Sequence, residues 1–318
     1  MSRNHLGYAC INQTLSDTLD VCTNRTLRMK TLVEKGVEYL SELIQGNLQA
    51  LQQVLEWNYN NGFKMYRLSS EIFPFYSHPI HGYDIKNLPH AEIILQLLLD
   101  IGDYSVKTEQ RLTFHPGPFN VLASPNPAVV DKTINELNCH SKIFDLMGFS
   151  PSWENKINIH VGGAYDDKPS ALSRFCTAFD RLDNNTKLRV TVENDDRASL
   201  YSVLDLYEGV YKVTGTPIVF DYHHHQFNTG NLSERDALEL ALSTWPMDII
   251  PVFHYAESKT LEQGLENPTP AHSNYITGSF DTYGHSFDIV FEAKKKEQAV
   301  FSFLKVNPNC SLVTCGSL

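Results

Sequence analysis

The sequence predicts a parallel (β/α)₈ barrel of the TIM type, forming a single domain over residues 1–318. Eight short strand-like runs alternate with helix-like stretches along the whole chain, and this alternation is typical of such a barrel. Several of the runs are continuously apolar, which suits strands that are buried on both faces. With 318 residues and 42% hydrophobic content, the chain can bury one large core. We expect a flexible C-terminal tail from about residue 306.

The expected strands are rich in Val, Ile and Phe. They are HLGYAC (5–10), KMYRLS (64–69), QRLTFH (110–115), KINIH (156–160), RVTVE (189–193), PIVFD (217–221), IIPVFH (249–254) and FDIVFE (287–292). Helices are expected within residues 26–62, 88–106, 126–148, 168–184, 197–210, 233–245 and after 292, and the first of these ranges holds one or two. Residues 255–286 form a long link rich in Pro, Gly and Asn, and long irregular loops are often functional.

Composition narrows the class of protein. No apolar run approaches the roughly 18–20 residues that span a bilayer, and the N-terminus lacks the apolar core of a signal peptide, so we expect a soluble intracellular protein. The six cysteines form no CxxC pair, which favours neither a zinc ribbon nor a disulfide scaffold. The net charge of −11 by itself argues against a nucleic-acid partner, but carboxylates that bind divalent cations reverse their local charge.

Six consecutive expected strands carry a His, Asp or Glu at their carboxyl ends. These residues are His115, His160, Glu193, Asp221, His254 and Glu292. In a barrel these ends converge on one mouth, where active sites of this fold lie. The set contains no Cys, and mixed imidazole and carboxylate ligands suit Zn²⁺, Mn²⁺ or Fe²⁺.

The number of ligands predicts more than one ion. His272 of the long link adds a further imidazole, and one metal often takes only three or four protein ligands. We therefore expect two or three metals with a carboxylate such as Glu193 as a bridge. Clustered metals activate a water and neutralise charge during an in-line phosphoryl displacement.

The stretch FDYHHHQF (220–227) leaves two geometries open. If the strand continues in pleated form, His223 shares the face of Asp221, by the period of two. If the chain turns helically after Asp221, His224 shares that face instead. In the helical geometry, His223 and His225 point away from that face.

Other residues near the expected mouth have alternative interpretations. Tyr8 and Asn12 follow the first strand and are either core and cap residues or contacts to a substrate. His78 lies in the loop after the second strand and is either an ordinary loop histidine or part of the site. Arg67 is a candidate ion-pair partner on the second strand.

The ordered motifs of this sequence resemble those of the UV damage endonuclease family. They are LGYACIN, YRLSSEIFPFYSHP, FHPG followed by SPNP, NIHVGG, VENDD, FDYHHH, FHY, AHSNYI and FEAKKKE. The family is similar to barrels of the endonuclease IV type. The resemblance implies a DNA repair enzyme that cuts the phosphodiester 5′ to cyclobutane pyrimidine dimers and (6-4) photoproducts and leaves a 3′-hydroxyl. It implies a divalent metal cluster, with Mn²⁺ expected and Zn²⁺, Mg²⁺ or Co²⁺ as alternatives.

The resemblance also implies roles for individual residues. The implied metal ligands are His115, His160, Glu193, Asp221, His224, His254, His272 and Glu292, and catalytic roles are implied for Glu193, His78, His254 and Glu292. Tyr8, Asn12, Pro118 and Phe119 match positions that probe the lesion. The expected partner is damaged double-stranded DNA, and we expect the protein to be a monomer. Dimers stack and pair poorly, so flipping them out of the helix costs less than flipping normal bases.

Two positions depart from the family pattern. The family usually has Gln followed by an aromatic after HPG, whereas this chain has Pro118 and Phe119. Phe119 can still wedge between bases, but the amide hydrogen bond is lost. Some members carry a lysine that can be carboxylated two residues before the strand-seven histidine, and Val252 stands there in this chain.

Two other functions compete with this interpretation. A sugar isomerase or epimerase barrel also uses His, Asp, Glu and divalent metals, but it typically needs fewer metals and fewer imidazoles. A catalytically weakened barrel that binds DNA or stores metal is the third hypothesis. The intact ligand set argues against it, whereas the departures at Pro118 and Val252 keep it open.

Overall fold

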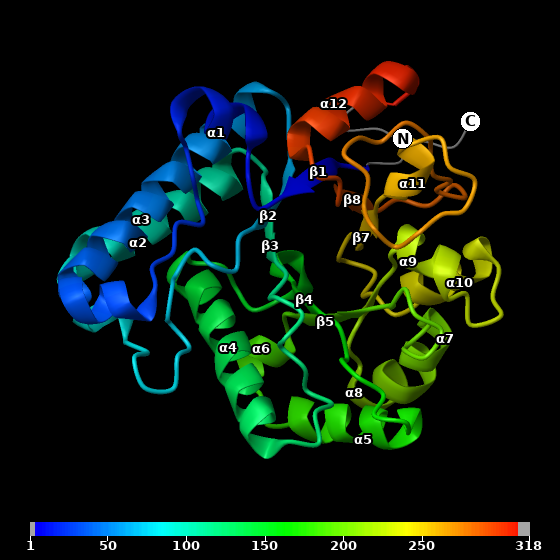
Figure 1. Cartoon of the computed structure of the whole chain (residues 1–318), viewed down its shortest axis with the longest axis horizontal. Coiled ribbons are helices and arrows are strands. Elements are labelled where there is room, and N and C mark those ends of the chain that lie inside the picture. The colour runs from blue at the N-terminus through cyan, green and yellow to red at the C-terminus, as the bar shows by residue number, and fades with distance from the viewer. Residues whose placement is uncertain (1–3, 311–318) are drawn as a thin grey trace.

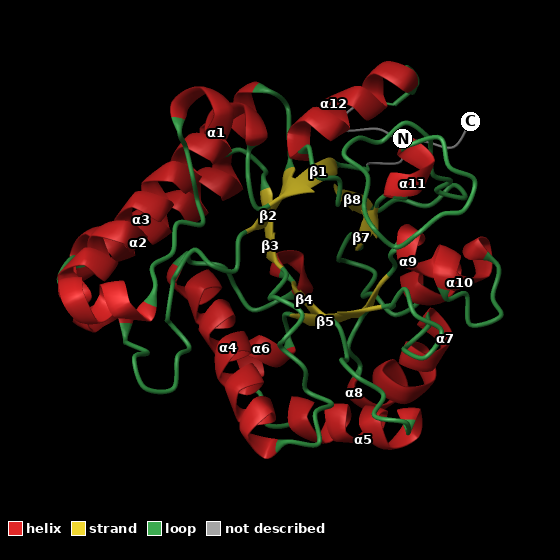
Figure 2. Ribbon diagram, in the orientation of Figure 1, coloured by secondary structure: helices red, strands yellow, loops and turns green. Residues whose placement is uncertain are grey.

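The computed structural model of the chain describes residues 4–310 and contains an eight-stranded parallel sheet. The strands form a central ring with helices around it (Figures 1 and 2). Their bounds are β1 Leu6–Ala9, β2 Met65–Leu68, β3 Arg111–Phe114, β4 Ile157–Ile159, β5 Val190–Glu193, β6 Ile218–Val219, β7 Val252–Tyr255 and β8 Asp288–Phe291. Each overlaps a run that the sequence singled out, so the barrel prediction is confirmed.

The barrel is nearly closed. The strands pair in the order β6-β5-β4-β3-β2-β1-β8-β7. Between β6 and β7 a single parallel bridge joins Asp221 to His254, and the His254 amide donates to the Phe220 carbonyl at 3.0 Å. The seam of the barrel therefore runs through two of the predicted ligands.

The helices follow the strands as alternation predicts. They are α1 Gln13–Leu19, α2 Met29–Asn60, α3 Ala91–Lys107, α4 Pro127–Leu146, α5 Lys168–Phe179, α6 Asn184–Lys187, α7 Val203–Leu206, α8 Lys212–Thr214, α9 Tyr222–Phe227, α10 Glu234–Leu242, α11 Lys259–Glu262 and α12 Lys296–Val306. A π-helical turn, Tyr207–Tyr211, joins α7 to α8, and short 3₁₀ turns cover Ile85–Asn87 and Trp153–Asn155. The first long stretch is one helix, α2, interrupted only by non-helical backbone at Gly36.

Burial explains the apolar strand pattern. All residues of β1, β3, β4, β5, β7 and β8 are buried, because the barrel interior covers one face and the helices cover the other. Towards the mouth the inner face becomes polar. Lys156, Asn158 and His160 share that face by the period of two, and Thr191 and Glu193 lie beside them on β5.

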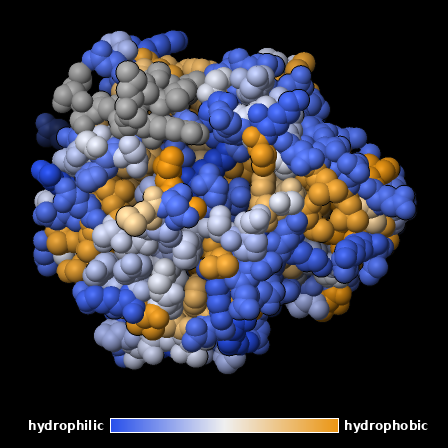
Figure 3. All heavy atoms as spheres, turned by 180° about the vertical axis from the view of Figure 1, so that it is seen from behind, coloured by the Kyte–Doolittle hydropathy of each residue, from blue (hydrophilic) through white to orange (hydrophobic). Residues whose placement is uncertain are grey.

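The surface and the ends of the chain complete the fold. None of the helices in residues 4–310 is both long and apolar enough to cross a membrane. The face seen from behind is mostly hydrophilic, with hydrophobic side chains in separate patches (Figure 3). Helix α12 continues to Val306, and most of the tail that was expected to be flexible, residues 311–318, lies outside the described residues.

Candidate metal centre

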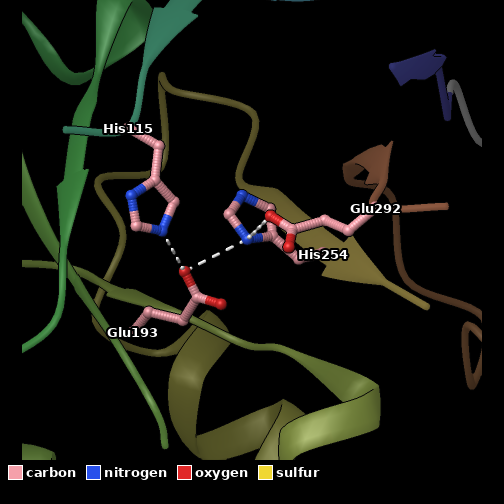
Figure 4. Close-up of side chains that lie close together, drawn as sticks. All are labelled: His115, Glu193, His254 and Glu292. Atoms are coloured by element: carbon pink, nitrogen blue, oxygen red, sulfur yellow. Dashed lines mark hydrogen bonds and ion pairs between the residues drawn. The ribbon is translucent and has the colours of Figure 1, made fainter. Parts of the chain in front are cut away.

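The carboxyl ends of the strands bring the predicted ligands together at one mouth. Two groups of side chains lie close enough to hold a metal ion, with the ligand atoms of each group within 4.8 Å of one another. One group is His115, Glu193, His254 and Glu292, which come from β3, β5, β7 and β8 (Figure 4), and the other is His160, Glu193 and His224. Glu193 belongs to both groups, which is the arrangement of a bridging carboxylate.

Glu193 lies at the centre of the cluster, with its side chain only 1% exposed. Its Oε2 is 3.1 Å from His115 Nε2 and 3.1 Å from His254 Nδ1. Both rings point at this carboxylate in Figure 4. Its Oε1 lies 3.4 Å from His224 Nδ1, on the side of the second group. The two oxygens of one carboxylate therefore face different sets of imidazoles.

Glu292 forms the other acidic wall of the first group. Its Oε1 is 3.2 Å from His254 Nδ1 and also pairs with Arg67, which reaches across from β2. Burial alone would raise the pKa of Glu292, but Arg67 and His254 outweigh burial and hold that pKa well below its usual range. Glu292 is therefore ionised at neutral pH. The ion-pair role expected for Arg67 is the one that the structure gives it.

Helix α9 settles the geometry of the triple histidine. The chain turns helically after Asp221, whose carboxylate caps α9 by accepting a hydrogen bond from the His224 amide at 2.8 Å. His224 consequently faces the cluster, with Nδ1 3.8 Å from Asp221 Oδ2. His223 contacts the Pro270 carbonyl at 3.1 Å, and the His225 ring packs on Phe220.

His272 reaches the mouth from the long link between β7 and β8. A bridge to Ser258 aligns its backbone, and Nδ1 lies 2.8 Å from the Glu292 carbonyl oxygen. That contact leaves Nε2 as the nitrogen available to a metal. Glu262 holds the segment that follows His272 by accepting hydrogen bonds from the amides of Asn274 and Tyr275 at 2.9 and 3.1 Å. His272 lies outside the two tight groups but borders the first through Glu292.

Burial and charge shift the pKa values of the proposed ligands in different directions. Burial lowers the pKa of His115, and it lowers the pKa of His254 to about 4. For Glu193 burial opposes ionisation, but His254 and His160 outweigh it and hold the pKa well below its usual range. Burial also opposes the charged form of His160, yet Glu193 and Asp195 raise its pKa to about 10. Metal binding would therefore displace a proton from His160 but not from His115 or His254.

Unsatisfied atoms provide an independent test of whether a cation fits. Glu193 Oε1, Asp221 Oδ2 and His254 Nδ1 are buried and accept or donate no hydrogen bond of normal geometry. Buried polar atoms are rarely left without partners, and each one costs stability. Glu193 and His254 belong to the groups described above, and Asp221 Oδ2 lies 3.8 Å from His224 Nδ1. The donor set of imidazole nitrogens and carboxylate oxygens thus fits a divalent ion.

Three buried residues support the ligands and were not singled out from the sequence. Asn158 donates to Glu193 Oε2 and accepts from the Thr191 hydroxyl at 2.9 Å. Asp195 lies 3.0 Å from His160 Nδ1 and fixes that ring. Lys156 is fully buried, with Nζ 3.4 Å from His254 Nε2. The alternation of side chains along a strand could have identified two of them, because Lys156 and Asn158 precede His160 by four and two positions and so share its face.

Tyr8 and Asn12 occupy the core and cap positions that the sequence had left open for them. Tyr8 is fully buried, and its hydroxyl contacts Asn58 at 2.5 Å and accepts from Asn12 at 2.8 Å. Asn12 caps α1 by accepting from the Leu15 amide. Both side chains are buried in these positions, and their lesion-probing role stays a prediction.

His78 is placed apart from the tight groups. Its Nδ1 accepts from the amides of Ile80 and His81 at 3.2 and 3.1 Å, and its ring packs against Phe75. Within residues 4–310 no hydrogen bond or ion pair joins His78 to the cluster. Its catalytic role stays a prediction.

The loop after β3 carries Pro118, which departs from the family pattern, and Phe119, which keeps its aromatic. Pro118 is exposed, and Phe119 is 89% exposed, so an aromatic ring projects into solvent beside the mouth. The second departure, Val252, is fully buried in a small apolar cluster with Ala9, Met65 and Val290. It provides no ligand atom.

Comparisons with known proteins identify the family to which the chain belongs. A family model described as UV-endonuclease UvdE matches residues 4–314. A UV-damage endonuclease of Schizosaccharomyces pombe is 34% identical over 329 residues, covering 99% of this chain and 53% of that protein. A UV DNA damage endonuclease of Bacillus cereus is 31% identical over 274 residues, covering 83% and 82%. The chain thus spans about half the length of the yeast relative and most of the bacterial one.

Solved structures match the same fold. The crystal structure of SacUVDE superimposes with a TM-score of 0.82 at 30% identity, covering 96% of this chain and 98% of that one. A 3-keto-D-glucoside 4-epimerase from E. coli has a TM-score of 0.51 at 10% identity, which reflects the shared barrel alone. Since the family model spans nearly the whole chain and relatives above 30% identity cover most of it, the chain belongs to the UV-endonuclease UvdE family.

Proposed function

We propose that the protein is a metal-dependent DNA repair endonuclease. It hydrolyses the phosphodiester 5′ to a UV photolesion, so that water adds across the P–O bond and leaves a 3′-hydroxyl and a 5′-phosphate. The single observation that carries this proposal is the cluster around Glu193, where two groups of imidazoles and carboxylates share one carboxylate. The names of the yeast and bacterial relatives support the choice of DNA as substrate.

The cluster would hold two or three divalent ions, with Mn²⁺ expected. His115, His254 and Glu292 would hold one, and His160 and His224 another, with Glu193 between them. Asp221 and His272 lie at the edge of these groups and complete the proposed ligand set. When bound, such ions polarise the phosphate, lower the pKa of water and neutralise the charge that develops on the oxygens.

The chain's own residues would orient these ligands and keep the site dry. Arg67 holds Glu292 in its ionised form, and Asn158 fixes the Glu193 carboxylate against rotation. Asp195 orients the His160 ring. Partners of this kind set ligand basicity and geometry in metal sites. Glu193, His254, Glu292 and His78 remain the residues for which we propose catalytic roles.

Lesion recognition would use the loop after β3. Phe119 is exposed beside the mouth and is suited to wedge between bases, with Pro118 stiffening the loop in place of the usual amide. The DNA would bend or open at the wedge, and a poorly stacked dimer would leave the helix at lower cost than normal bases. This selects damage without reading sequence, in line with a monomer that acts on double-stranded DNA inside the cell.

An end-labelled duplex with one thymine dimer tests the proposal. With Mn²⁺ we expect incision immediately 5′ to the dimer and none in an undamaged duplex. Glu193→Gln keeps the shape but removes the shared charge, and it should slow incision at least about 100-fold, since metal stabilisation supplies several kcal/mol. Glu42→Gln on the exposed face of α2 is the matched control and should leave the rate unchanged.

Three outcomes would contradict the proposal. Absence of cutting with Mn²⁺, Zn²⁺, Mg²⁺ and Co²⁺, while the dimer duplex is still bound, would favour a barrel that binds DNA without cutting it. Epimerase activity on a free sugar without incision would favour the sugar enzymes that share the barrel. Full activity of Glu193→Gln would refute the bridging role.

A further inference from the structure

A basic turn borders the metal centre on the side of β8. Lys294 and Lys296 line a cavity of about 370 Å³ together with Arg67, His272 and Glu292. The last two of these residues belong to the proposed ligand set, so the cavity opens directly onto the cluster. It is the place where positive side chains and the cluster meet at one surface.

The side chains of the two lysines are less engaged than that of Arg67. Arg67 is already paired with Glu292. Within the described residues, neither Lys294 nor Lys296 forms an ion pair or a side-chain hydrogen bond, although Lys296 is partly buried. Burial is the main cause that lowers the pKa of Lys296, and Arg67 acts in the same direction, while the nearby carboxylates of Glu292 and Glu297 oppose them. A partly buried ammonium without a direct hydrogen bond or ion pair is costly, and an anion in the cavity would relieve that cost.

The backbone holds these lysines in a fixed place. The amides of Lys294 and Lys295 donate to the carbonyls of Ser273 and Asn274, both at 3.0 Å, and tie the turn to the segment that carries His272. Lys296 has a positive φ of 51°, which is uncommon for a residue other than Gly and tends to persist where function fixes it. The backbone of this turn is thus held by the same loop that carries a proposed ligand.

We propose that this cavity receives a backbone phosphate of the cleaved DNA strand, held by Lys296 and Lys294. The inference rests on the proposed function and names the residues that anchor its substrate. Lysine is a compact point charge that binds phosphate well, and a chain with a net charge of −11 needs such a local positive site to approach DNA. Because the cavity shares Glu292 and His272 with the cluster, this phosphate would lie near the scissile bond.

The test compares Lys296→Met with Lys305→Met, the same change at the exposed far end of α12. On the dimer duplex with Mn²⁺, Lys296→Met should lower kcat/KM about tenfold, mainly through KM, because one charge-assisted contact is lost. It should also reduce the slope of log(kcat/KM) against log[salt] by about 1. Lys296→Arg should restore most of the loss, and Lys305→Met should change neither quantity. Melting temperatures of all variants report whether each one folds.

Single methylphosphonate linkages identify the phosphate that is held. Each substitution removes the charge of one linkage near the dimer, and one of them should cost the wild type about tenfold while costing Lys296→Met nothing further. Additive effects at every linkage, or an unchanged salt slope, would overturn the proposal. If the wild type fails to cut the dimer duplex, the proposed function itself has failed, whereas a normal wild type with a normal Lys296→Met refutes only the phosphate site. Inhibition by inorganic phosphate that both proteins share equally would also count against it.

Discussion

The buried amine of Lys156 should make the stability of this protein depend on pH in a way that one substitution removes. Lys156 lies at the start of β4, fully buried, with Nζ 3.4 Å from His254 Nε2. Burial is the main cause that lowers its pKa from 10.5 to about 7. Nearby Arg67 and Arg111 act in the same direction, while Glu193 opposes them.

The sign follows from proton binding. Between pH 7 and 10.5 the unfolded chain keeps the Lys156 proton and the folded chain releases it, so the free energy of unfolding rises with pH in this window. For one titrating group, each pH unit in this window raises the free energy of unfolding by about 1.4 kcal/mol. The stability that this residue contributes is complete above the unfolded pKa and is lost as the pH falls towards 7. From pH 7 to 9, the free energy of unfolding of the wild type should rise by about 2 kcal/mol relative to that of Lys156→Met.

Urea unfolding in EDTA at pH 7, 8 and 9 measures this difference. Methionine has a similar length and no charge, so it removes the titration while filling the same space. Lys30→Met on the exposed side of α2 is the matched control, and its profile should run parallel to that of the wild type. If the Lys156→Met profile also runs parallel to the wild type, the amine keeps its proton in the folded protein and the reasoning fails.

Two further predictions concern the metal centre and the DNA. Asn158→Leu keeps the shape of the side chain but removes the donor to Glu193 and the acceptor for Thr191. Calorimetric titration with Mn²⁺ should then show an affinity about 10–100-fold lower than that of the wild type. An unchanged affinity would mean that the histidines alone fix Glu193. Phe119→Ala should leave the midpoint of urea unfolding unchanged, since the ring is 89% exposed. In an anisotropy assay it should weaken binding to the dimer duplex by about 1–3 kcal/mol. Equal binding by the variant and the wild type would exclude Phe119 as the wedge.

The sequence was enough to predict the barrel because its signals are local and repeated. Each strand is a short apolar run with a helix after it, and eight repeats of that pattern leave few alternatives. The convergence of His115, His160, Glu193, His254 and Glu292 followed from parallel strand direction alone, since their carboxyl ends must meet at one mouth.

Positions that depend on a local turn were only partly predictable. For the triple histidine, the sequence left the pleated and helical geometries open, and the family resemblance favoured His224. The structure selects the helical one because the Asp221 side chain caps α9 and starts a helix at Tyr222. For Tyr8, the structure adds a contact that no single segment encodes, because Asn58 of α2 accepts from the phenol across 50 residues of sequence.

What the sequence by itself determined is the order of the elements and the type of chemistry at the mouth, because hydrophobic periodicity and residue type can be read one segment at a time. Only the tertiary structure decided which atoms meet. It placed Glu193 between two sets of imidazoles, set Lys156 against His254, and paired Arg67 with Glu292, 225 positions away. These relations depend on burial and on charges from other strands, which no single segment encodes.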